Sequence, residues 1–491
     1  MATVVAGAGI EDVPLFINGA RRSSSGATEQ LLNPATGVPI GVLHHATGDE
    51  INAAVEAAYN AFPSWSATPV LQRCRVFFHF HAVLEKHADE LIRMVTEENG
   101  KTLDEAKGSF ARGLECVEFA AGATSLMMGD TVENVGTGVD GYSIRQPLGV
   151  CAGITPFNFP FMVPLWMYPM AIACGNTFVL KPSERVPRTA VRTAELLHEA
   201  GLPVGVLNVV HGAKAAVDGI LNHPKIRAVS FVGSSNVAKY VYSTAAANGK
   251  RVQALGGAKN HSVVMPDADL KNAAQVVMAS SFGCAGERCV ATSVVVAVGD
   301  IADNLVAELR QLADEMKVGD GGEKGTVMGP VITADASKRI TGYIEKGLDE
   351  GAKLVRDGRK DGCTKSDGNF LGPTIFDNVS PQMKIAREEI FGPVLSVVRV
   401  KTMDEALQVI QGSQYGNASS IFTRSGKTAR EFVGRVQTGM VGVNVGVPAP
   451  TAIFPFAGWR GSFFGDLHAL GKDSVQFYTE SKVVTARWPE N

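Results

Sequence analysis

The stretch FGCAGERCVA, Phe282 to Ala291, sets two cysteines among glycine, alanine and charged residues. A cysteine thiolate is a strong nucleophile that forms thioesters with carbonyl substrates. Cys284 lies in the small-residue run SSFGCAG, which is typical of an inert packing thiol. Cys289 follows Gly-Glu-Arg and precedes a β-prone run, so we expect it at a loop-to-strand junction. Arg288 beside it would help to stabilise a thiolate, which makes Cys289 the candidate nucleophile.

Zinc binding and dithiol redox chemistry are alternatives for paired cysteines. The spacing C-x4-C is too wide for a usual zinc knuckle, and no second Cys/His pair with ligand spacing follows. A redox pair is more often C-x-x-C. His79 and His81 are two residues apart on a predicted helix and would point to different faces. The sequence therefore predicts no metal site.

Thiolate attack on an aldehyde creates a tetrahedral oxyanion, which needs hydrogen-bond donors. Asn158, in TPFNFP, ends a β-prone run and lies between prolines that restrict the backbone. Its side-chain amide could be such a donor. The alternative is a turn-forming asparagine.

Two segments offer a nucleotide site. In SFVGSSNVAKYV a strand ends at Gly233 and a helix opens at Ser234, so free N–H groups could hold a diphosphate; an ordinary capped helix is the alternative. In VLKPSE, Lys181 and Glu184 follow the carboxyl end of a strand. A carboxylate there could accept both ribose hydroxyls and would repel a 2′-phosphate, favouring NAD over NADP. A solvated ion pair is the alternative. GAGIED, Gly7 to Asp12, opens no helical pattern and is set aside.

The elements that would position these residues follow from periodicity. Residues 50–127 repeat apolar residues at helical spacing, which predicts helices. From about Gly149, short β-prone runs alternate with helical stretches, which predicts a parallel sheet covered on both faces. The alternation resumes after Cys289, so we expect a second α/β unit.

Composition excludes several classes of protein. The chain has 491 residues, enough for two or more domains, and a net charge of -3 without a basic tract, so nucleic acid is not an expected partner. Seven scattered cysteines indicate reduced thiols in a cytoplasmic setting. The N-terminus lacks the pattern of a signal peptide. The apolar run 159–174 contains three prolines and predicts buried core, not a membrane span.

The strings TPFNFP, KPSE, FVGS, GERC and EEIFGP occur along nearly the whole chain in the order found in the aldehyde dehydrogenase superfamily, which the sequence resembles. The resemblance implies an α/β fold with a Rossmann-type NAD domain, an α/β catalytic domain and a small β oligomerisation segment. It implies that Cys289 is the nucleophile, and that Asn158 and the Cys289 N–H form the oxyanion hole. The cofactor-binding residues that it implies are Phe157, Lys181, Glu184, Ser234, Glu389 and Phe391.

One position departs from the superfamily. Its E-L-G-G-K motif usually begins with a glutamate that activates water, whereas this chain reads LGGAK with Leu255 at that position. A thioester on Cys289 should then hydrolyse slowly and wait for another nucleophile. A thiol such as coenzyme A suits this role, because part of it is thiolate near neutral pH.

Longer strings narrow the resemblance. GAKNH, ARGLE, SLMMGD, NVGVPAP and YTESKVVTARW are similar to the CoA-acylating methylmalonate- and malonate-semialdehyde dehydrogenases. That group oxidises a 3-oxo acid with NAD and CoA, releases carbon dioxide, and acts in valine or inositol breakdown. The resemblance implies that Arg288 and Arg112 bind the substrate carboxylate, for which arginine is suited.

The expected organisation has three parts. Residues 1–127 and 148–255 would form the NAD-binding domain, 256–446 the catalytic domain, and 128–147 with 470–491 the oligomerisation segment of a homodimer or homotetramer. Two alternatives stay open: a hydrolytic aldehyde dehydrogenase with a base from elsewhere, and a catalytically silent protein that keeps the fold.

Overall fold

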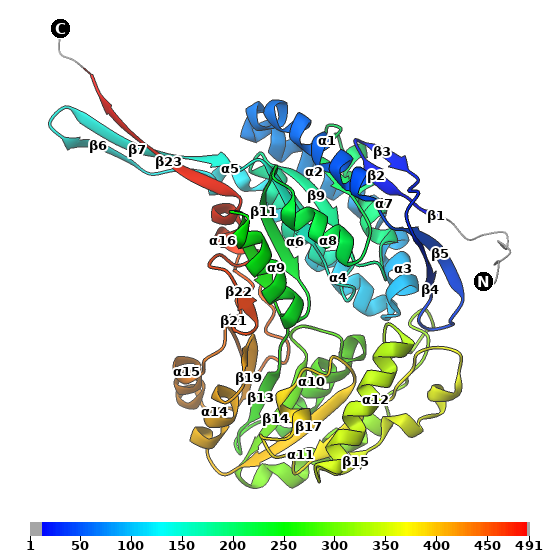
Figure 1. The fold of residues 1–491 in the computed structure, drawn as a ribbon. Helices are drawn as coiled ribbons and strands as arrows, with labels where there is room; N and C mark the ends of the chain where they lie inside the picture. Colours follow the sequence, from blue (N-terminus) through cyan, green and yellow to red (C-terminus); the bar gives the residue numbers. More distant parts are fainter. Residues whose placement is uncertain (1–11, 489–491) are drawn as a thin grey trace.

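Two sheets and a projecting arm organise residues 12–488, the part of the chain that the computed structural model describes (Figure 1). An eight-stranded sheet lies in the upper half of the view, and a seven-stranded sheet lies in the lower half. A three-stranded arm extends away from the upper half. GAGIED lies outside the described residues except for Asp12, which opens β1 (Asp12–Val13).

The eight-stranded sheet has a parallel centre and antiparallel edges. Its strands in spatial order are β22 (Phe463–Phe464), β12 (Arg251–Leu255), β11 (Ile226–Val232), β8 (Val150–Ile154), β9 (Thr177–Lys181), β10 (Leu207–Val209), β2 (Leu15–Ile17) and β3 (Ala20–Arg22). Along the chain, the parallel strands are therefore added outward from β8 in both directions: β9 and β10 on one side, and β11 and β12 on the other. Such a sheet has a switch point where the strand order reverses, here between β8 and β11, and ligands bind outside the carboxyl ends of the strands there.

Helices cover both faces of this sheet, because alternate side chains of each strand point to opposite faces. In β9, Val179 joins a hydrophobic cluster on one face, called the first face below, and its neighbours Phe178 and Leu180 join another cluster on the second face. The first face is covered by α1 (Gly48–Ala67), α8 (Lys214–Asn222) and α9 (Ser235–Ala247). The second face is covered by α6 (Met162–Ala173) and α7 (Arg188–Glu199), with α2 (Val70–Lys86), α3 (Ala88–Asn99), α4 (Leu103–Ala121), α5 (Ala123–Leu126) and α16 (Gly471–Phe477) packed outside them.

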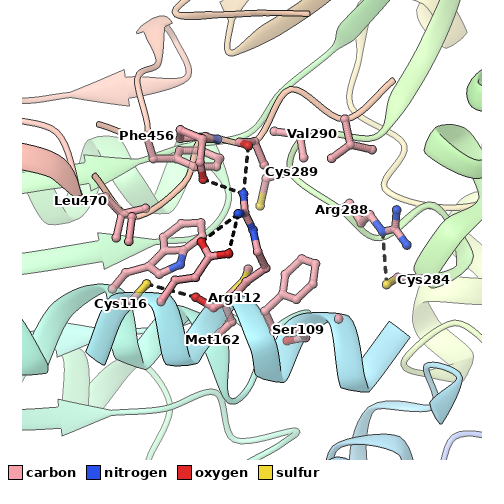
Figure 2. A pocket seen from close by; sticks show the side chains of 18 of the residues that line it. Ser109, Arg112, Cys116, Met162, Cys284, Arg288, Cys289, Val290, Phe456 and Leu470 are labelled. Atoms are coloured by element: carbon pink, nitrogen blue, oxygen red, sulfur yellow. Dashed lines mark hydrogen bonds and ion pairs between the residues drawn. The ribbon is translucent and has the colours of Figure 1, made fainter. Parts of the chain in front are cut away.

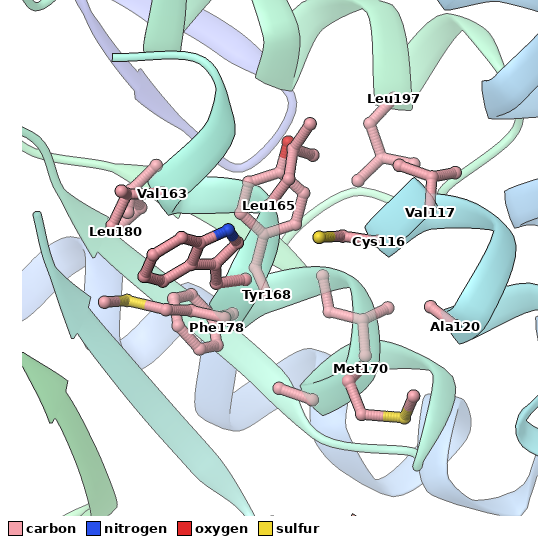
Figure 3. Close-up of a cluster of buried hydrophobic side chains, with 14 of the residues drawn as sticks. Cys116, Val117, Ala120, Val163, Leu165, Tyr168, Met170, Phe178, Leu180 and Leu197 are labelled. Atoms are coloured by element: carbon pink, nitrogen blue, oxygen red, sulfur yellow. The ribbon is translucent and has the colours of Figure 1, made fainter. Parts of the chain in front are cut away.

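The apolar run 159–174 forms α6, whose residues are buried from Val163 onward. Figure 3 shows side chains of α6 packed together with Val117 of α4, Leu197 of α7 and Phe178 of β9. The prediction of buried core is thus confirmed. Across residues 12–488, we find no helix with the length and apolar character needed to cross a membrane.

The seven-stranded sheet is parallel except for one edge strand. Its strands in spatial order are β15 (Lys353–Arg356), β16 (Thr374–Asp377), β17 (Val394–Val400), β14 (Thr292–Val298), β13 (Asn260–Val264), β19 (Ala418–Phe422) and β20 (Met440–Val443). Its helices are α10 (Leu270–Phe282), α11 (Ala302–Asp314), α12 (Ala334–Asp349), α13 (Lys384–Arg387), α14 (Met403–Gln411) and α15 (Gly426–Arg435). A separate hydrophobic cluster fills this unit, as the predicted second α/β alternation requires.

The arm pairs segments that are far apart in sequence. β7 (Val139–Pro147) forms a hairpin with β6 (Thr131–Gly136) and pairs antiparallel along its whole length with β23 (Thr479–Arg487). Two small sheets complete the fold. They consist of β1, β5 (Pro39–His44) and β4 (Thr28–Leu32), and of β18 (Tyr415–Gly416) with β21 (Trp459–Arg460).

Candidate active site

The predicted site residues of the two sheets meet at one place. Those of the first sheet lie at carboxyl ends of strands, and those of the second sheet lie at amino ends. In the first sheet, the motif residues follow strand carboxyl ends: Asn158 comes after β8, and Ser234 after β11. In the second sheet, they precede strand amino ends: Cys289 comes before β14 and Glu389 before β17. The loop-to-strand position predicted for Cys289 is confirmed.

Asn158 and Cys289 are in contact at this meeting point. Asn158 Nδ2 lies 3.5 Å from Cys289 Sγ and donates a hydrogen bond to the carbonyl oxygen of Glu287 at 3.0 Å. The Glu287 carbonyl fixes one of the two amide hydrogens. The other hydrogen is then directed at the sulfur, where an oxyanion would form on a carbonyl carbon bound to that sulfur.

The backbone of the loop that leads to Cys289 has three consecutive residues with positive φ. After α10 the chain takes the left-handed region at Cys284 (φ 51°), Ala285 (φ 52°) and Gly286 (φ 72°). A Cβ on Gly286 would lie 2.3 Å from the carbonyl oxygen of Gly392, so only glycine fits there. The Cys289 carbonyl oxygen then accepts hydrogen bonds from two side-chain amides, those of Asn260 at 2.9 Å and Asn417 at 2.8 Å. These contacts fix the nucleophile on a loop, not on a regular element.

Burial governs the acidity of the Cys289 thiol. Desolvation raises the pKa of Cys289 to about 11, and the nearby charge of Glu389 acts in the same direction. The hydrogen bond from Asn158 and the positive charge of Lys101 act to lower that pKa. In this state of the protein the thiol is therefore mostly protonated at neutral pH.

A cavity of about 830 Å³ reaches Cys289 from the side of the first sheet. Its lining includes every residue expected to bind a dinucleotide: Phe157, Lys181, Glu184, Ser234, Glu389 and Phe391. Lys181 Nζ is 3.0 Å from Glu184 Oε2, and Ser234 is the N-cap residue of α9, whose first turn faces the cavity. Burial is the largest influence on the pKa of Glu184 and acts to raise it, but the charge of Lys181, the hydrogen bonds to the carboxylate and the charge of Arg185 together hold that pKa below its ordinary value.

The inner end of this cavity is closed by two phenylalanines and a carboxyl group. The rings of Phe157 and Phe391 meet edge to face at 5.8 Å between centroids. Phe391 has a φ of 52°, which is uncommon for a bulky residue, and its carbonyl oxygen accepts a hydrogen bond from Arg339 at 3.4 Å. Glu389 Oε1 accepts from the Ala258 N–H at 2.9 Å, while burial raises the pKa of Glu389.

A second cavity, of about 470 Å³, reaches Cys289 from the other side (Figure 2). Arg112, Arg288 and Cys284 all lie in its wall. The Arg288 side chain extends toward Cys284, not toward Cys289 (Figure 2), with Nε 3.3 Å from Cys284 Sγ and Nη2 3.3 Å from Glu105 Oε1. The sequence suggests that Arg288 could help to stabilise a thiolate at Cys289; in the structure its guanidinium group contacts the other thiol, that of Cys284. Cys284 is buried, as expected of a packing thiol, but it also lines this cavity.

Arg112 is held on α4 by several acceptors. Its Nη1 is 2.8 Å from Glu115 Oε2, and its Nη2 donates to the carbonyl oxygens of Ala449 and Pro450 at 3.1 and 2.9 Å (Figure 2). Both arginines therefore face one cavity, and each is paired with a glutamate.

Comparisons with known proteins agree with this arrangement. Residues 21–484 match the model of the Aldehyde dehydrogenase family. The chain belongs to the aldehyde dehydrogenase family. Malonate-semialdehyde dehydrogenase 1 of Geobacillus thermodenitrificans (strain NG80-2) is 56% identical over 481 residues, which are 98% of this chain and 99% of that relative. The malonate-semialdehyde dehydrogenase of Pseudomonas aeruginosa is 52% identical over 477 residues, which are 97% of this chain and 96% of that relative.

Solved structures of the family share the fold closely. Methylmalonate-semialdehyde dehydrogenase from Oceanimonas doudoroffii superposes with a TM-score of 0.97 at 50% identity, covering 98% of this chain and 99% of that one. A second structure comes from Sinorhizobium meliloti 1021; it is assigned as a methylmalonate-semialdehyde dehydrogenase and is complexed with NAD. It superposes with a TM-score of 0.97 at 49% identity, and the match covers 99% of each chain. The predicted aldehyde dehydrogenase fold is thus confirmed, and these relatives support NAD-dependent aldehyde oxidation by this chain.

The first cavity fits the family's dinucleotide. An ion-paired carboxylate at its outer part suits ribose hydroxyls, the first turn of α9 suits a diphosphate, and two aromatic rings near Cys289 suit a flat ring. These groups therefore suit the parts of NAD.

Leu255 is the residue that the motif resemblance places where the family usually has a water-activating glutamate. This residue ends β12, is 4% exposed, and belongs to the hydrophobic cluster against which Cys289 packs. Burial of this kind suits leucine, and the side chain brings no proton acceptor to the thiol.

Sequence reasoning missed three residues that hold the site in place, all in the segment 99–105, which runs from the last residue of α3 into the first turn of α4. Asn99 Nδ2 donates to the carbonyl oxygen of Phe157 at 3.0 Å, and Lys101 Nζ donates to that of Asn158 at 2.5 Å. Glu105 Oε1 accepts from the Cys284 N–H at 2.5 Å. Two local signals mark the segment: Gly100, whose φ of 88° ends α3 in a left-handed cap, and the capping box of Thr102 and Glu105 at the start of α4. Neither signal shows that these side chains reach the loops of Asn158 and Cys284.

Proposed function

We propose that this enzyme oxidises malonate semialdehyde or methylmalonate semialdehyde with NAD, releases carbon dioxide, and transfers the remaining acyl group to coenzyme A. The products would be acetyl-CoA or propionyl-CoA. The carrying observation is that Cys289, contacted by Asn158, lies where two cavities meet. One cavity carries the groups for a dinucleotide and the other carries two arginines. The names of the relatives, at 52% and 56% identity, support the choice of substrate.

The first half of the reaction uses Cys289 and Asn158. The Cys289 thiol loses its proton to solvent, and the thiolate attacks the aldehyde carbon. The carbonyl oxygen becomes an oxyanion that accepts a hydrogen bond from Asn158 Nδ2. NAD, when bound in the first cavity, supplies the acceptor for the two electrons that leave the aldehyde carbon. A thioester on Cys289 then remains, with the substrate carboxylate β to its carbonyl carbon.

The second half removes carbon dioxide and frees the enzyme. The bond between the carboxylate and the α-carbon breaks, its electron pair forms the enolate of the thioester, and the donors at the oxyanion position stabilise that enolate. The α-carbon takes a proton. The CoA thiolate then attacks the thioester carbonyl, and Cys289 leaves as thiolate. Leu255 supports this route, because it offers no base to activate water against the thioester.

Recognition of the substrate carboxylate is assigned to Arg288 and Arg112. In this structure these arginines pair with Glu105 and Glu115 respectively. A bound substrate carboxylate would either bind each arginine beside its glutamate or replace that glutamate. Both arrangements are possible because a guanidinium group carries five N–H donors.

The arginine assignment predicts a selective loss. Arg288→Met and Arg112→Met should each lower the ratio of kcat/KM for malonate semialdehyde to kcat/KM for propanal by about 10- to 100-fold, since hydrogen bonds to charged groups contribute about 1.5–3 kcal/mol. Propanal is the internal control, because it meets the same cavity without a carboxylate. Steady-state rates with both aldehydes give the ratio, and equal losses for the two would remove the carboxylate role.

Position 255 predicts a change in the fate of the thioester. Leu255→Glu should raise the yield of free acid relative to acyl-CoA by about tenfold or more, because a general base contributes about 10²- to 10⁴-fold. Leu255→Gln is the matched control, similar in size and polarity but unable to take a proton. The two products are separated by chromatography after reaction with CoA present. If the glutamate and glutamine variants gave one product ratio, deacylation would be controlled elsewhere.

A hydrolytic aldehyde dehydrogenase is the second candidate, favoured by one observation. Glu287 is buried two residues before Cys289, and burial raises the pKa of Glu287 to about 8, so its carboxyl group could exchange a proton near neutral pH. Its Oε1, however, accepts from the Ile332 N–H at 3.4 Å.

One experiment decides between the two candidates. The enzyme is mixed with malonate semialdehyde and NAD, with and without CoA, and NADH and acetyl-CoA are measured. We expect a single burst of NADH without CoA, and sustained turnover to acetyl-CoA with it. Sustained turnover to free acid without CoA would establish the hydrolytic candidate.

The arm is proposed to join subunits of a homodimer or homotetramer in the cytoplasm. Its strands expose the apolar side chains of Val132, Val135 and Val483 to 57%, 62% and 75%. Apolar residues on a projecting sheet are commonly covered by another chain. We also propose the three-part division into residues 1–127 with 148–255, residues 256–446, and residues 128–147 with 470–491. The pairing of β7 with β23 supports the separation of the arm from the two sheets.

A further inference from the structure

Lys101 is a charged side chain inside the protein that the proposed reaction does not use. The residue is 2% exposed, and its Nζ lies 2.5 Å from the carbonyl oxygen of Asn158 and 3.9 Å from the centroid of the Phe159 ring. Burial of a lysine is costly unless the ammonium group has partners. Here the partner is the backbone of the residue whose side chain faces Cys289.

The segment 99–105 reaches both loops of the site. Asn99 and Lys101 hold the successive carbonyl oxygens of Phe157 and Asn158. Glu105 caps α4 by accepting the Thr102 N–H with Oε2 at 3.0 Å, and its Oε1 accepts the Cys284 N–H. One rigid connection, capped at both ends, thus contacts the loop that supplies the oxyanion amide and the loop that supplies the nucleophile.

Close backbone packing fixes this segment. A Cβ on Gly329 would lie 2.0 Å from the carbonyl oxygen of Gly100, and a Cβ on Gly321 would lie 2.4 Å from that of Lys101. The Leu103 N–H also donates to the carbonyl oxygen of Gly321 at 3.1 Å. The lysine therefore projects from a backbone that cannot shift without disturbing a second loop.

We propose that Lys101 is a positioning residue for aldehyde oxidation: its ammonium group fixes the Asn158 backbone, and so aims the Asn158 amide at the oxyanion. The Asn158 side chain itself donates to the carbonyl oxygen of Glu287 and contacts Cys289 Sγ. Without the lysine, the carbonyl at 158 would be a buried acceptor that has lost its charged donor, and the peptide could rotate. A shift of about 1 Å in a catalytic group can cost about 100-fold in rate.

The charge of Lys101 has a second consequence for Cys289. Lys101 acts to lower the pKa of the Cys289 thiol, in the same direction as the Asn158 hydrogen bond, while Glu389 acts to raise it. Lys101 itself faces Cys284, Glu105, Arg288 and Glu287, and burial lowers the pKa of its ammonium group. Removing the charge should therefore leave a Cys289 thiol that ionises at higher pH.

The test compares Lys101→Met, Lys101→Gln and Lys101→Arg with Lys250→Met. Lys250 is an apt control because it is also buried, 7% exposed, and donates to two carbonyl oxygens, those of His223 and Ile226, at 2.6 and 3.0 Å. It lines neither cavity. The readouts are the rate of the NADH burst with propanal and NAD, the dissociation constant of NAD, the pH profile of Cys289 alkylation by iodoacetamide, and the thermal midpoint.

We expect Lys101→Met to slow the burst by about 10- to 100-fold, with the NAD dissociation constant close to that of the parent. The alkylation profile should move to higher pH. Lys101→Arg, which keeps the charge and the donors, should recover most of the burst, and Lys250→Met should keep it. If Lys101→Met does not fold, Lys101→Arg and Lys101→Gln decide, with the arginine variant the faster.

Two results would overturn the proposal. The first is a burst that falls no further in Lys101→Met than in Lys250→Met. The second is equal rates and equal alkylation profiles for the arginine and glutamine variants, which would make Lys101 a space-filling residue. The proposal concerns aldehyde oxidation alone, so neither result depends on whether CoA or water completes the reaction.

Discussion

Replacing Cys289 with alanine should abolish NADH formation from malonate semialdehyde, by a factor of about 10⁴ or more, as removal of a covalent nucleophile does. The reason is geometric as well as chemical, because Cys289 is the thiol that Asn158 contacts and that both cavities reach. NAD should still bind, since the groups proposed to hold it lie on other elements. The measurement is the NADH burst, followed by absorbance after mixing with aldehyde and NAD.

Cys284→Ala is the matched control, a second cavity-lining thiol five residues earlier. It should keep most of the burst, although it removes the sulfur that Arg288 contacts at 3.3 Å. The opposite pattern, with Cys289→Ala active and Cys284→Ala inactive, would discard the assignment of the nucleophile. Mass spectrometry of the parent enzyme mixed with aldehyde and NAD should find the acyl adduct on Cys289.

Alkylation of the parent enzyme gives the pH dependence. Because burial raises the pKa of Cys289 to about 11, the thiolate is a small fraction at neutral pH and grows as pH rises toward that value. In the absence of NAD, the rate of Cys289 alkylation should therefore rise about tenfold per pH unit through the neutral range. A rate that levels off below pH 8 would contradict this.

Asn158→Ala should lower the burst rate by about 10²- to 10³-fold, the usual cost of removing one oxyanion donor. The alanine also removes the hydrogen bond that lowers the pKa of Cys289. At a fixed pH, alkylation of Cys289 should slow as well, but by less than the burst, because alkylation forms no oxyanion on a carbonyl carbon. The comparison of the two rates in one variant separates the two roles.

The contradicting outcome for Asn158 is a burst that falls only as far as alkylation does. The amide would then act on the thiol alone and not on the oxyanion. The thermal midpoint is the control for folding, since Asn158 is 2% exposed and its amide also ties the loop to the carbonyl oxygen of Glu287.

Much of the fold could be predicted because its signals are local. The run in β9 is apolar throughout, as a strand buried on both faces requires, and Lys181 marks its end. The same alternation of strand and helix gave the two α/β units. The strands β1 to β5 escaped prediction. β1, β2 and β3 have two or three residues each, too few to show a period, and no alternation with helices surrounds these strands. Strand β22 has two residues and joins the first sheet from position 463, a pairing that no local pattern announces.

The candidate site also has features that the sequence predicts and features that it does not. The chemical types at positions 158, 181, 184, 289 and 389 are visible in the sequence, and the structure brings them to the walls of one cavity. The contacts of Arg288 were not visible. The side chain has several rotatable bonds, and its partner Glu105 is 183 residues away along the chain.

The sequence by itself determined which atoms can react, that strands and helices alternate, and that leucine stands where a base is usual. These properties belong to single residues or to short periodic segments. The tertiary structure alone decided that Asn158 meets Cys289 across 131 residues, that Lys101 holds the Asn158 carbonyl, and that each arginine faces a glutamate. Such contacts depend on where two sheets meet end to end, and the position of that junction is set by the packing of the whole chain.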